Sequence, residues 1–125
     1  MIKKKILIIE DEQALNEAYQ LILGKNNYDV YSAYGGDDAL QLTKKIEPDL
    51  ILLDLRMPRM NGIEFLQKYD LSQSHPGVKV IVFSNLDTQK DINQAYELGA
   101  HKYMLKAWAS PKELVQLVRE TLDDK

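Results

Sequence analysis

The chain has 125 residues, 45% of them hydrophobic and 28% charged, which is the balance of one globular domain rather than of a disordered or fibrous chain. Its formal net charge of −3 argues against a protein that holds nucleic acid through a basic face, so we expect no direct nucleic-acid partner. The absence of cysteine excludes disulfides, thiolate metal sites and thiol catalysis and fits a reducing cytoplasm, and no apolar run approaches the roughly 20 residues of a membrane span.

The first half of the chain alternates apolar runs with segments of helical spacing. Residues 6–9 are continuously apolar, which predicts a parallel strand buried on both faces, and residues 15–22 then repeat at helical spacing up to Gly24. A second strand is predicted at residues 30–33, and a second helix between Asp37 and Pro48. The apolar run at residues 50–53 predicts the third strand.

The second half continues the alternation. A helix is expected at residues 63–69, a strand at 78–83, a helix after the capping-box-like residues 88–91, and a strand at 103–105. The last helix has the clearest start, with Ser110 at the N-cap, Pro111 at the first position and Glu113 at the third. Five strands alternating with five helices predict a single α/β domain over residues 1–125, doubly wound, with right-handed crossovers.

Polar side chains follow the strands of this predicted sheet. Glu10 and Asp11 come directly after the first strand, Asp54 after the third, Ser84 after the fourth and Lys106 after the fifth. Any one acid could simply favour the start of a helix. Ligands of doubly wound sheets, however, bind at the carboxyl ends of the strands, so we expect these side chains to form one site.

The residue types at this edge favour phosphoryl chemistry. Neighbouring carboxylates repel each other, and a hard cation such as Mg²⁺ relieves that repulsion with oxygen ligands from Asp11, Asp54 and Glu10. Asp54 can attack phosphorus to form an acyl phosphate, while Lys106 and Ser84 stabilise the phosphoryl oxygens. Because no general base is evident, the site suits phosphoryl acceptance better than rapid turnover.

The sequence resembles the receiver domain of two-component response regulators over essentially the whole chain. The resemblance rests on residues 6–12 (ILIIEDE), 48–58 (PDLILLDLRMP) with Asn61 and Gly62, 80–84 (VIVFS) and 98–106 (LGAHKYMLK). Each piece is short, but their order and spacing are highly specific. The resemblance implies a flavodoxin-like (βα)5 fold, with five parallel strands in the order 2-1-3-4-5 and helices on both faces.

The resemblance also implies residue roles. Asp54 would be the phosphoacceptor, and the Mg²⁺ ligands would be Glu10, Asp11, Asp54 and the backbone carbonyl of Arg56. Ser84 stands at the family's switch Ser/Thr position, Lys106 at the position of its lysine, and Tyr103 matches the aromatic residue that turns inward on activation.

The implied partners follow from the family as well. The phosphoryl donor would be a sensor histidine kinase or a histidine phosphotransfer protein, and the recipient of the signal a downstream protein target or an output domain outside this chain. The protein would not be an enzyme beyond its own phosphoryl transfer and slow autodephosphorylation. It would be a monomer or a weak dimer through the face of the fourth helix, fifth strand and fifth helix.

Several residues depart from the family's usual pattern. Ala107 follows the lysine where most members have a proline with a cis bond, which leaves open whether the Lys106–Ala107 bond is cis. Asn85 is larger than the small residue common at its position and could crowd the acyl phosphate. Arg56 and Leu86 flank the path of the attacking water in the family, so a cationic and an apolar residue there predict a long-lived phosphorylated state.

Three alternatives differ in chemistry. A haloacid-dehalogenase-type phosphatase needs a second acid two residues after its nucleophile, where this chain has Arg56. A flavin-binding electron carrier needs a hydroxyl-rich phosphate loop after the first strand, where this chain has three acids. A degenerate receiver that binds partners without phosphorylation is the third alternative, and the Ala107 departure keeps it open.

Overall fold

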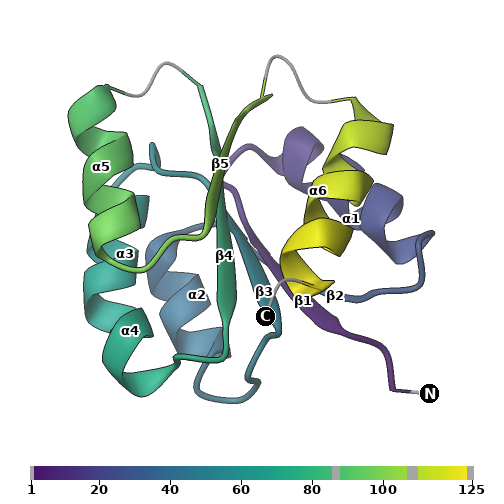
Figure 1. The fold of residues 1–125 in the computed structure, drawn as a ribbon, viewed down its shortest axis with the longest axis horizontal. Helices are drawn as coiled ribbons and strands as arrows, with labels where there is room; N and C mark the ends of the chain where they lie inside the picture. The colour runs from purple at the N-terminus through teal and green to yellow at the C-terminus, as the bar shows by residue number, and fades with distance from the viewer. Residues whose placement is uncertain (1, 86–87, 107–109, 124–125) are drawn as a thin grey trace.

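The computed structural model describes residues 2–85, 88–106 and 110–123. Within these ranges five strands lie parallel in one sheet, in the order β2-β1-β3-β4-β5 (Figure 1). The strands are β1 (Lys5–Ile9), β2 (Asp29–Ala33), β3 (Leu50–Leu53), β4 (Lys79–Ser84) and β5 (Lys102–Leu105). The predicted fold class and strand order are therefore confirmed.

Helices connect the strands and cover both faces of the sheet. They are α1 (Gln13–Gly24), α2 (Gly36–Leu42), α3 (Gly62–Tyr69), α4 (Leu71–Ser74), α5 (Gln89–Glu97) and α6 (Pro111–Asp123). Helices α1 and α6 lie on one face, and α2 to α5 lie on the other (Figure 1).

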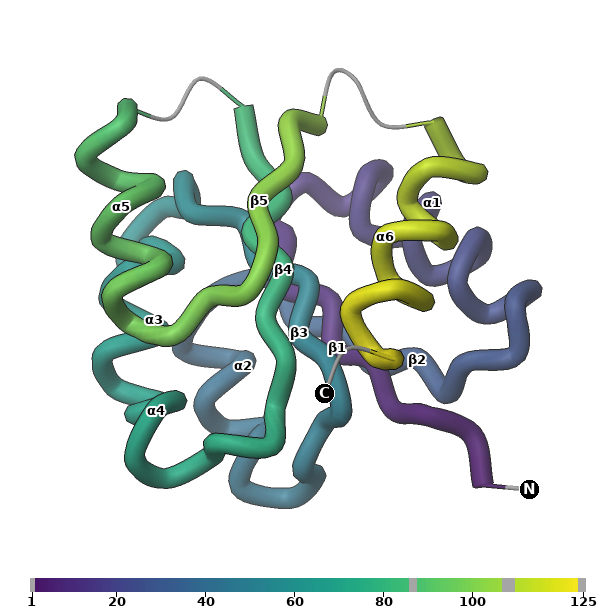
Figure 2. The backbone as a smooth tube through the Cα atoms, in the orientation of Figure 1, coloured from purple at the N-terminus to yellow at the C-terminus, as the bar shows by residue number. Residues whose placement is uncertain are grey.

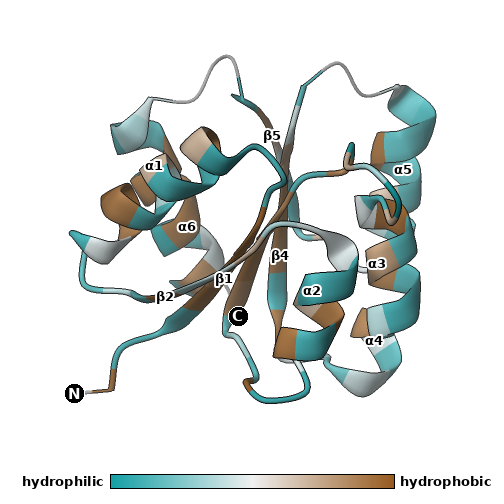
Figure 3. Cartoon of the chain, turned by 180° about the vertical axis from the view of Figure 1, so that it is seen from behind, coloured by the Kyte–Doolittle hydropathy of each residue, from teal (hydrophilic) through white to brown (hydrophobic). Residues whose placement is uncertain are grey.

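The two faces form separate hydrophobic clusters because successive side chains of a strand point to opposite sides. In β1, Leu7 and Ile9 pack towards α2, α3 and α5, whereas Ile6 and Ile8 pack towards α1 and α6. All four side chains are fully buried. Burial on both sides explains why residues 6–9 of β1 and residues 80–83 of β4 are all hydrophobic. The helices carry both hydrophobic and hydrophilic residues (Figure 3).

The chain reverses its winding direction between β1 and β3. From β1 it passes through α1 to β2 at one edge, then returns through α2 to β3 on the other side of β1 (Figure 2). Ile9 of β1 pairs in register with Leu53 of β3, so Glu10 and Asp54 leave the sheet side by side. This is the position at which doubly wound sheets hold their ligands.

Helix boundaries agree with the expected caps in two places. Thr88 and Asp91 form a reciprocal capping box at the start of α5, and the Ser110 hydroxyl accepts a hydrogen bond from the Glu113 backbone N–H at 3.1 Å. The one-turn helix α4 was not expected. It follows α3 directly because Asp70 adopts a left-handed conformation (φ 58°) that ends α3 and turns the chain.

None of the helices in the described ranges is both long enough and apolar enough to cross a membrane.

Candidate functional site

Residues from four strand ends meet in one hollow at the carboxyl edge of the sheet. Its volume is about 570 Å³, and eight residues line it: Glu10, Asp11, Glu12, Asp54, Arg56, Ser84, Asn85 and Lys106. The parallel register brings them together, since β1, β3, β4 and β5 all deliver their next residue to the same edge. The structure thus gathers the acids, the hydroxyl and the lysine that the sequence placed after the strands.

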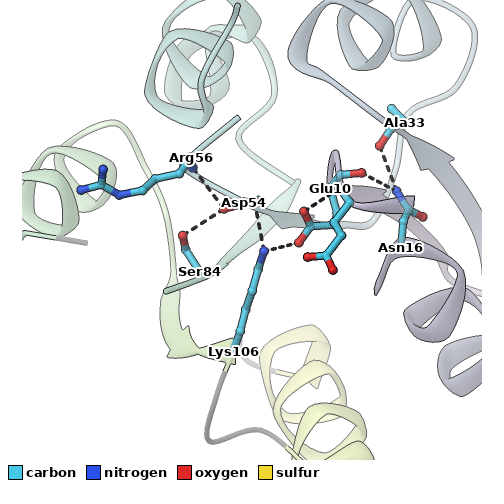
Figure 4. Close-up of polar contacts among 8 residues, drawn as sticks. Glu10, Asn16, Ala33, Asp54, Arg56, Ser84 and Lys106 are labelled. Atoms are coloured by element: carbon cyan, nitrogen blue, oxygen red, sulfur yellow. Dashed lines mark hydrogen bonds and ion pairs between the residues drawn. The ribbon is translucent and has the colours of Figure 1, made fainter. Parts of the chain in front are cut away.

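Asp54 is at the centre of this hollow and is 5% exposed. Its Oδ1 accepts hydrogen bonds from the Ser84 hydroxyl at 2.9 Å and from the Arg56 backbone N–H at 3.1 Å. Its Oδ2 accepts a hydrogen bond from Lys106 Nζ at 3.1 Å (Figure 4). Both carboxylate oxygens are thereby held in fixed positions by donors from β4, the β3–α3 loop and the end of β5.

Lys106 bridges two buried acids. Its ammonium group forms ion pairs with Glu10 and with Asp54, and the side chains of these acids are 3% and 6% exposed. Burial lowers the pKa of Lys106, but the hydrogen bond to Glu10 and the negative charge of Asp54 outweigh it, so its net pKa is raised. The lysine is therefore charged at neutral pH and is shared between the two carboxylates.

Glu10 is the acid most perturbed by this arrangement. Burial raises the pKa of Glu10, the hydrogen bond from Lys106 lowers it, and the negative charge of Asp54 raises it again. The resulting pKa is about 7. A second carboxylate oxygen of Glu10 accepts a hydrogen bond from the Glu12 backbone N–H at 3.1 Å. One ammonium group does not neutralise the acids that surround it.

The excess negative charge fits a divalent cation. Glu10, Asp11 and Asp54 each place a carboxylate oxygen within 4.8 Å of the others, and Asp11 is exposed to solvent. Oxygen donors of this type, open to water on one side, match the preference of Mg²⁺ for carboxylates together with retained waters. The Arg56 carbonyl as a further ligand stays a prediction.

Asn16 is a site-supporting residue that the sequence reasoning missed. It is fully buried in α1, and its amide nitrogen donates to the backbone carbonyls of Glu10 at 3.0 Å and Ala33 at 3.1 Å (Figure 4). The Gln20 amide donates to its oxygen at 2.9 Å. Asn16 therefore links the ends of β1 and β2 to α1. The sequence did offer a signal for this role, because Asn16 is a polar residue at helical spacing with Tyr19 and Leu23 on the inward face of α1.

The remaining predicted residues lie around the hollow. Asn85 lines it beside Ser84, and the Arg56 side chain extends from it towards α5. Tyr103 in β5 is half-buried and packs against the cluster that includes α3 and α5. Leu86 and Ala107 lie outside the described residues, and so does the Lys106–Ala107 peptide bond.

A family model for the response regulator receiver domain matches residues 6–119. Among solved structures, a CheY-like response regulator receiver domain protein from Methanospirillum hungatei is 28% identical, with a TM-score of 0.90 over 98% of this chain and 95% of that one. A DNA-binding response regulator of the LuxR family from Staphylococcus aureus is 27% identical, with a TM-score of 0.84 over 96% and 99%.

The chemotaxis protein CheY4 of Vibrio cholerae shares the fold at 21% identity, with a TM-score of 0.88 over 96% of this chain and 99% of that one. The match of the family model covers most of the chain and every residue gathered in the hollow. The chain belongs to the response regulator receiver domain family.

Proposed function

We propose that the chain, as one domain over residues 1–125, is a phosphoryl-operated switch in which Asp54 accepts a phosphoryl group from a phosphohistidine. The donor would be a sensor histidine kinase or a histidine phosphotransfer protein. The observation that carries the proposal is the set of donors around the Asp54 carboxylate: the Ser84 hydroxyl, the Arg56 N–H and the Lys106 ammonium group. A phosphoryl group on Asp54 would need the same donors for its oxygens.

In the transfer, a carboxylate oxygen of Asp54 attacks phosphorus, and the bond between phosphorus and the donor's imidazole nitrogen breaks. The product is an acyl phosphate, and the bond's electron pair leaves with the imidazole. Lys106 and Ser84 then pair with phosphoryl oxygens instead of with the carboxylate. Mg²⁺, held by Glu10, Asp11, Asp54 and the Arg56 carbonyl, would neutralise phosphoryl charge during the transfer.

The response would pass through Ser84 and Tyr103. Movement of the Ser84 hydroxyl towards the phosphoryl group would open space beside β5, into which Tyr103 turns. The predicted fourth and fifth helices are α5 and α6 in the structure. The face formed by α5, β5 and α6 would then change its surface and its affinity for a downstream protein or an output domain. The same face would support the weak dimer, if one forms. In the family, the positions of Arg56 and Leu86 flank the path of the attacking water, and here they carry a cationic and an apolar residue. Asn85, which lines the hollow, would also crowd the acyl phosphate, so we propose that hydrolysis is slow.

Intact mass measurement tests the proposal. The protein is incubated with Mg²⁺ and acetyl phosphate beside Asp54→Asn and beside Asp38→Asn, which removes an exposed acid from the first turn of α2. We expect one labile phosphoryl adduct on the unmodified protein and on Asp38→Asn, and none on Asp54→Asn.

Each other outcome identifies an alternative. An adduct that Asp54→Asn retains would disprove the site assignment. No adduct on any of the three proteins would favour a phosphorylation-independent binding module, and steady release of phosphate over many turnovers would favour a phosphatase.

A further inference from the structure

Arg56 connects the phosphoryl site to helix α5. Its backbone N–H donates to Asp54, whereas its guanidinium group lies 3.5 Å from a carboxylate oxygen of Asp91 in the first turn of α5. In Figure 4 the side chain points away from Asp54, although the backbone nitrogen of the same residue faces it. One residue therefore contacts both the phosphoacceptor and the helix that begins across the hollow.

A second hollow lies on the other side of this side chain. Its lining includes Leu55, Asn61 and Asp91, and Arg56 lines both this hollow and the one that contains Asp54. Arg56 thus forms part of the wall of both hollows. A change of side-chain rotamer, with the backbone in place, would move its charge from one hollow to the other.

The pair with Asp91 is weak enough to be exchanged. The Arg56 and Asp91 side chains are 57% and 35% exposed, and the 3.5 Å separation is at the long end of the range for an ion pair. Exposed pairs of this type contribute little to stability. A phosphoryl group carries about two negative charges and three acceptor oxygens, and arginine binds such groups through two parallel hydrogen bonds.

Asp91 also has a second partner that keeps it in place. Its carboxylate accepts a hydrogen bond from the Thr88 backbone N–H at 3.4 Å, and its own N–H donates to the Thr88 hydroxyl at 3.2 Å. The capping box therefore fixes the Asp91 carboxylate whether or not Arg56 is bound to it. On exchange, the exposed Arg56 side chain would be the one that changes its rotamer.

We propose that Asp91 is a positioning residue that holds the Arg56 guanidinium beside α5 while Asp54 is unmodified, and that a phosphoryl group on Asp54 draws the guanidinium away from it. This inference rests on the proposed phosphorylation of Asp54. The exchange links phosphorylation to the first turn of α5. By linkage, a partner that strengthens the Arg56–Asp91 pair would disfavour the phosphorylated state to the same degree.

Titration with beryllofluoride, a phosphoryl mimic, in the presence of Mg²⁺ tests the inference by calorimetry. The proteins are wild type, Asp91→Asn, Arg56→Gln and the double variant, with Glu97→Gln as the control that removes another exposed acid from α5. Asparagine at position 91 keeps an oxygen that can accept the Thr88 bond, so the helix start is preserved. Thermal unfolding of each variant checks that the fold is retained.

Release of Arg56 should make beryllofluoride bind about threefold more tightly to Asp91→Asn, in the range set by a weak exposed pair. The gain should be absent in the Arg56→Gln background and in Glu97→Gln. In the wild type, the NMR signal of the Arg56 Nε–H group should shift when beryllofluoride is added. The shift should be smaller in Asp91→Asn, in which the guanidinium has already left α5, whereas a merely structural role of Asp91 would leave its size unchanged.

Two results would overturn the inference alone: unchanged affinity of Asp91→Asn, or a gain that persists in the Arg56→Gln background. A wild-type protein that binds no beryllofluoride and takes no phosphoryl group from acetyl phosphate would overturn the proposed function together with the inference. Binding by the wild type therefore separates the two failures.

Discussion

Replacement of Asn16 by alanine should destabilise the fold and loosen the acidic site at the same time. The side chain is fully buried, and its amide donates to the carbonyls of Glu10 and Ala33. The Ala33 carbonyl also accepts a hydrogen bond from the Glu10 N–H at 3.1 Å, so it keeps a partner in the variant. The Glu10 carbonyl loses the donor that the structure describes for it.

The expected cost follows from these contacts. A buried acceptor left without a partner costs about 1–3 kcal/mol, and the space vacated by the amide group adds a cavity cost of up to about 1 kcal/mol. We expect Asn16→Ala to lower the free energy of unfolding by about 1–4 kcal/mol. Gln20→Ala is the matched control, because it removes the bond to the Asn16 oxygen and an exposed 3.5 Å bond to the Tyr34 hydroxyl but leaves the Glu10 and Ala33 carbonyls paired. It should cost less than about 1 kcal/mol.

Urea denaturation followed by circular dichroism measures both variants, and the rate of phosphorylation by acetyl phosphate measures the site. Asn16→Ala should be phosphorylated more slowly under conditions where it is fully folded, because the chain that carries Glu10 is no longer tied to α1. A loss below about 1 kcal/mol with an unchanged rate would refute the positioning role of Asn16.

Three further predictions concern the same edge of the sheet. Gly62→Ala should lower the free energy of unfolding by about 1–3 kcal/mol, because its Cβ would lie 2.6 Å from the backbone carbonyl oxygen of Asp54. Gly24→Ala is the control: its Cβ would have no atom within 4 Å, so it should not lower the free energy of unfolding. Thermal unfolding compares the two variants. In EDTA, Glu10 binds a proton more tightly in the folded state (pKa about 7) than in the unfolded state (4.5), so its contribution to stability should fall as pH rises from 4.5 to 7. Urea titrations at several pH values should show this fall in the free energy of unfolding for the wild type and a smaller fall for Glu10→Gln. Equal pH dependence in the two proteins would contradict the raised pKa of Glu10. Lys106→Met should cost about 3–5 kcal/mol at pH 8 in EDTA, because it removes the ion-pair partner of two buried carboxylates. Added Mg²⁺ should restore part of the loss, and a variant that Mg²⁺ does not stabilise would argue against the metal site.

Much of the fold could be predicted from the sequence, because its signals are local. The apolar runs at residues 6–9 and 50–53 are uninterrupted, which only strands covered on both faces require. The strand order implied by the family resemblance then places Glu10 and Asp54 at neighbouring strand ends. The helix starts at Thr88 and Ser110 could also be predicted from local sequence, since each cap involves residues three positions apart.

Other features depend on contacts between distant segments and were not predicted. The bridge from Lys106 to Glu10 joins residues 96 positions apart, and the Arg56–Asp91 pair joins residues 35 positions apart. Neither pair has a local sequence pattern, because each depends on side-chain rotamers and on the conformation of the loops at the edge of the sheet. Helix α4 was missed because it depends on the left-handed conformation of Asp70, which sequence spacing does not encode.

The central claim is that Asp54 carries the phosphoryl group, and chemical trapping tests it most directly. After incubation with acetyl phosphate and Mg²⁺, borohydride reduces an aspartyl phosphate to homoserine, and peptide mass spectrometry locates the modified position. The account predicts homoserine at position 54 and unmodified side chains at Glu10 and Asp11. Reduction at either of those acids, or at no position in a protein shown by mass to be phosphorylated, would contradict it.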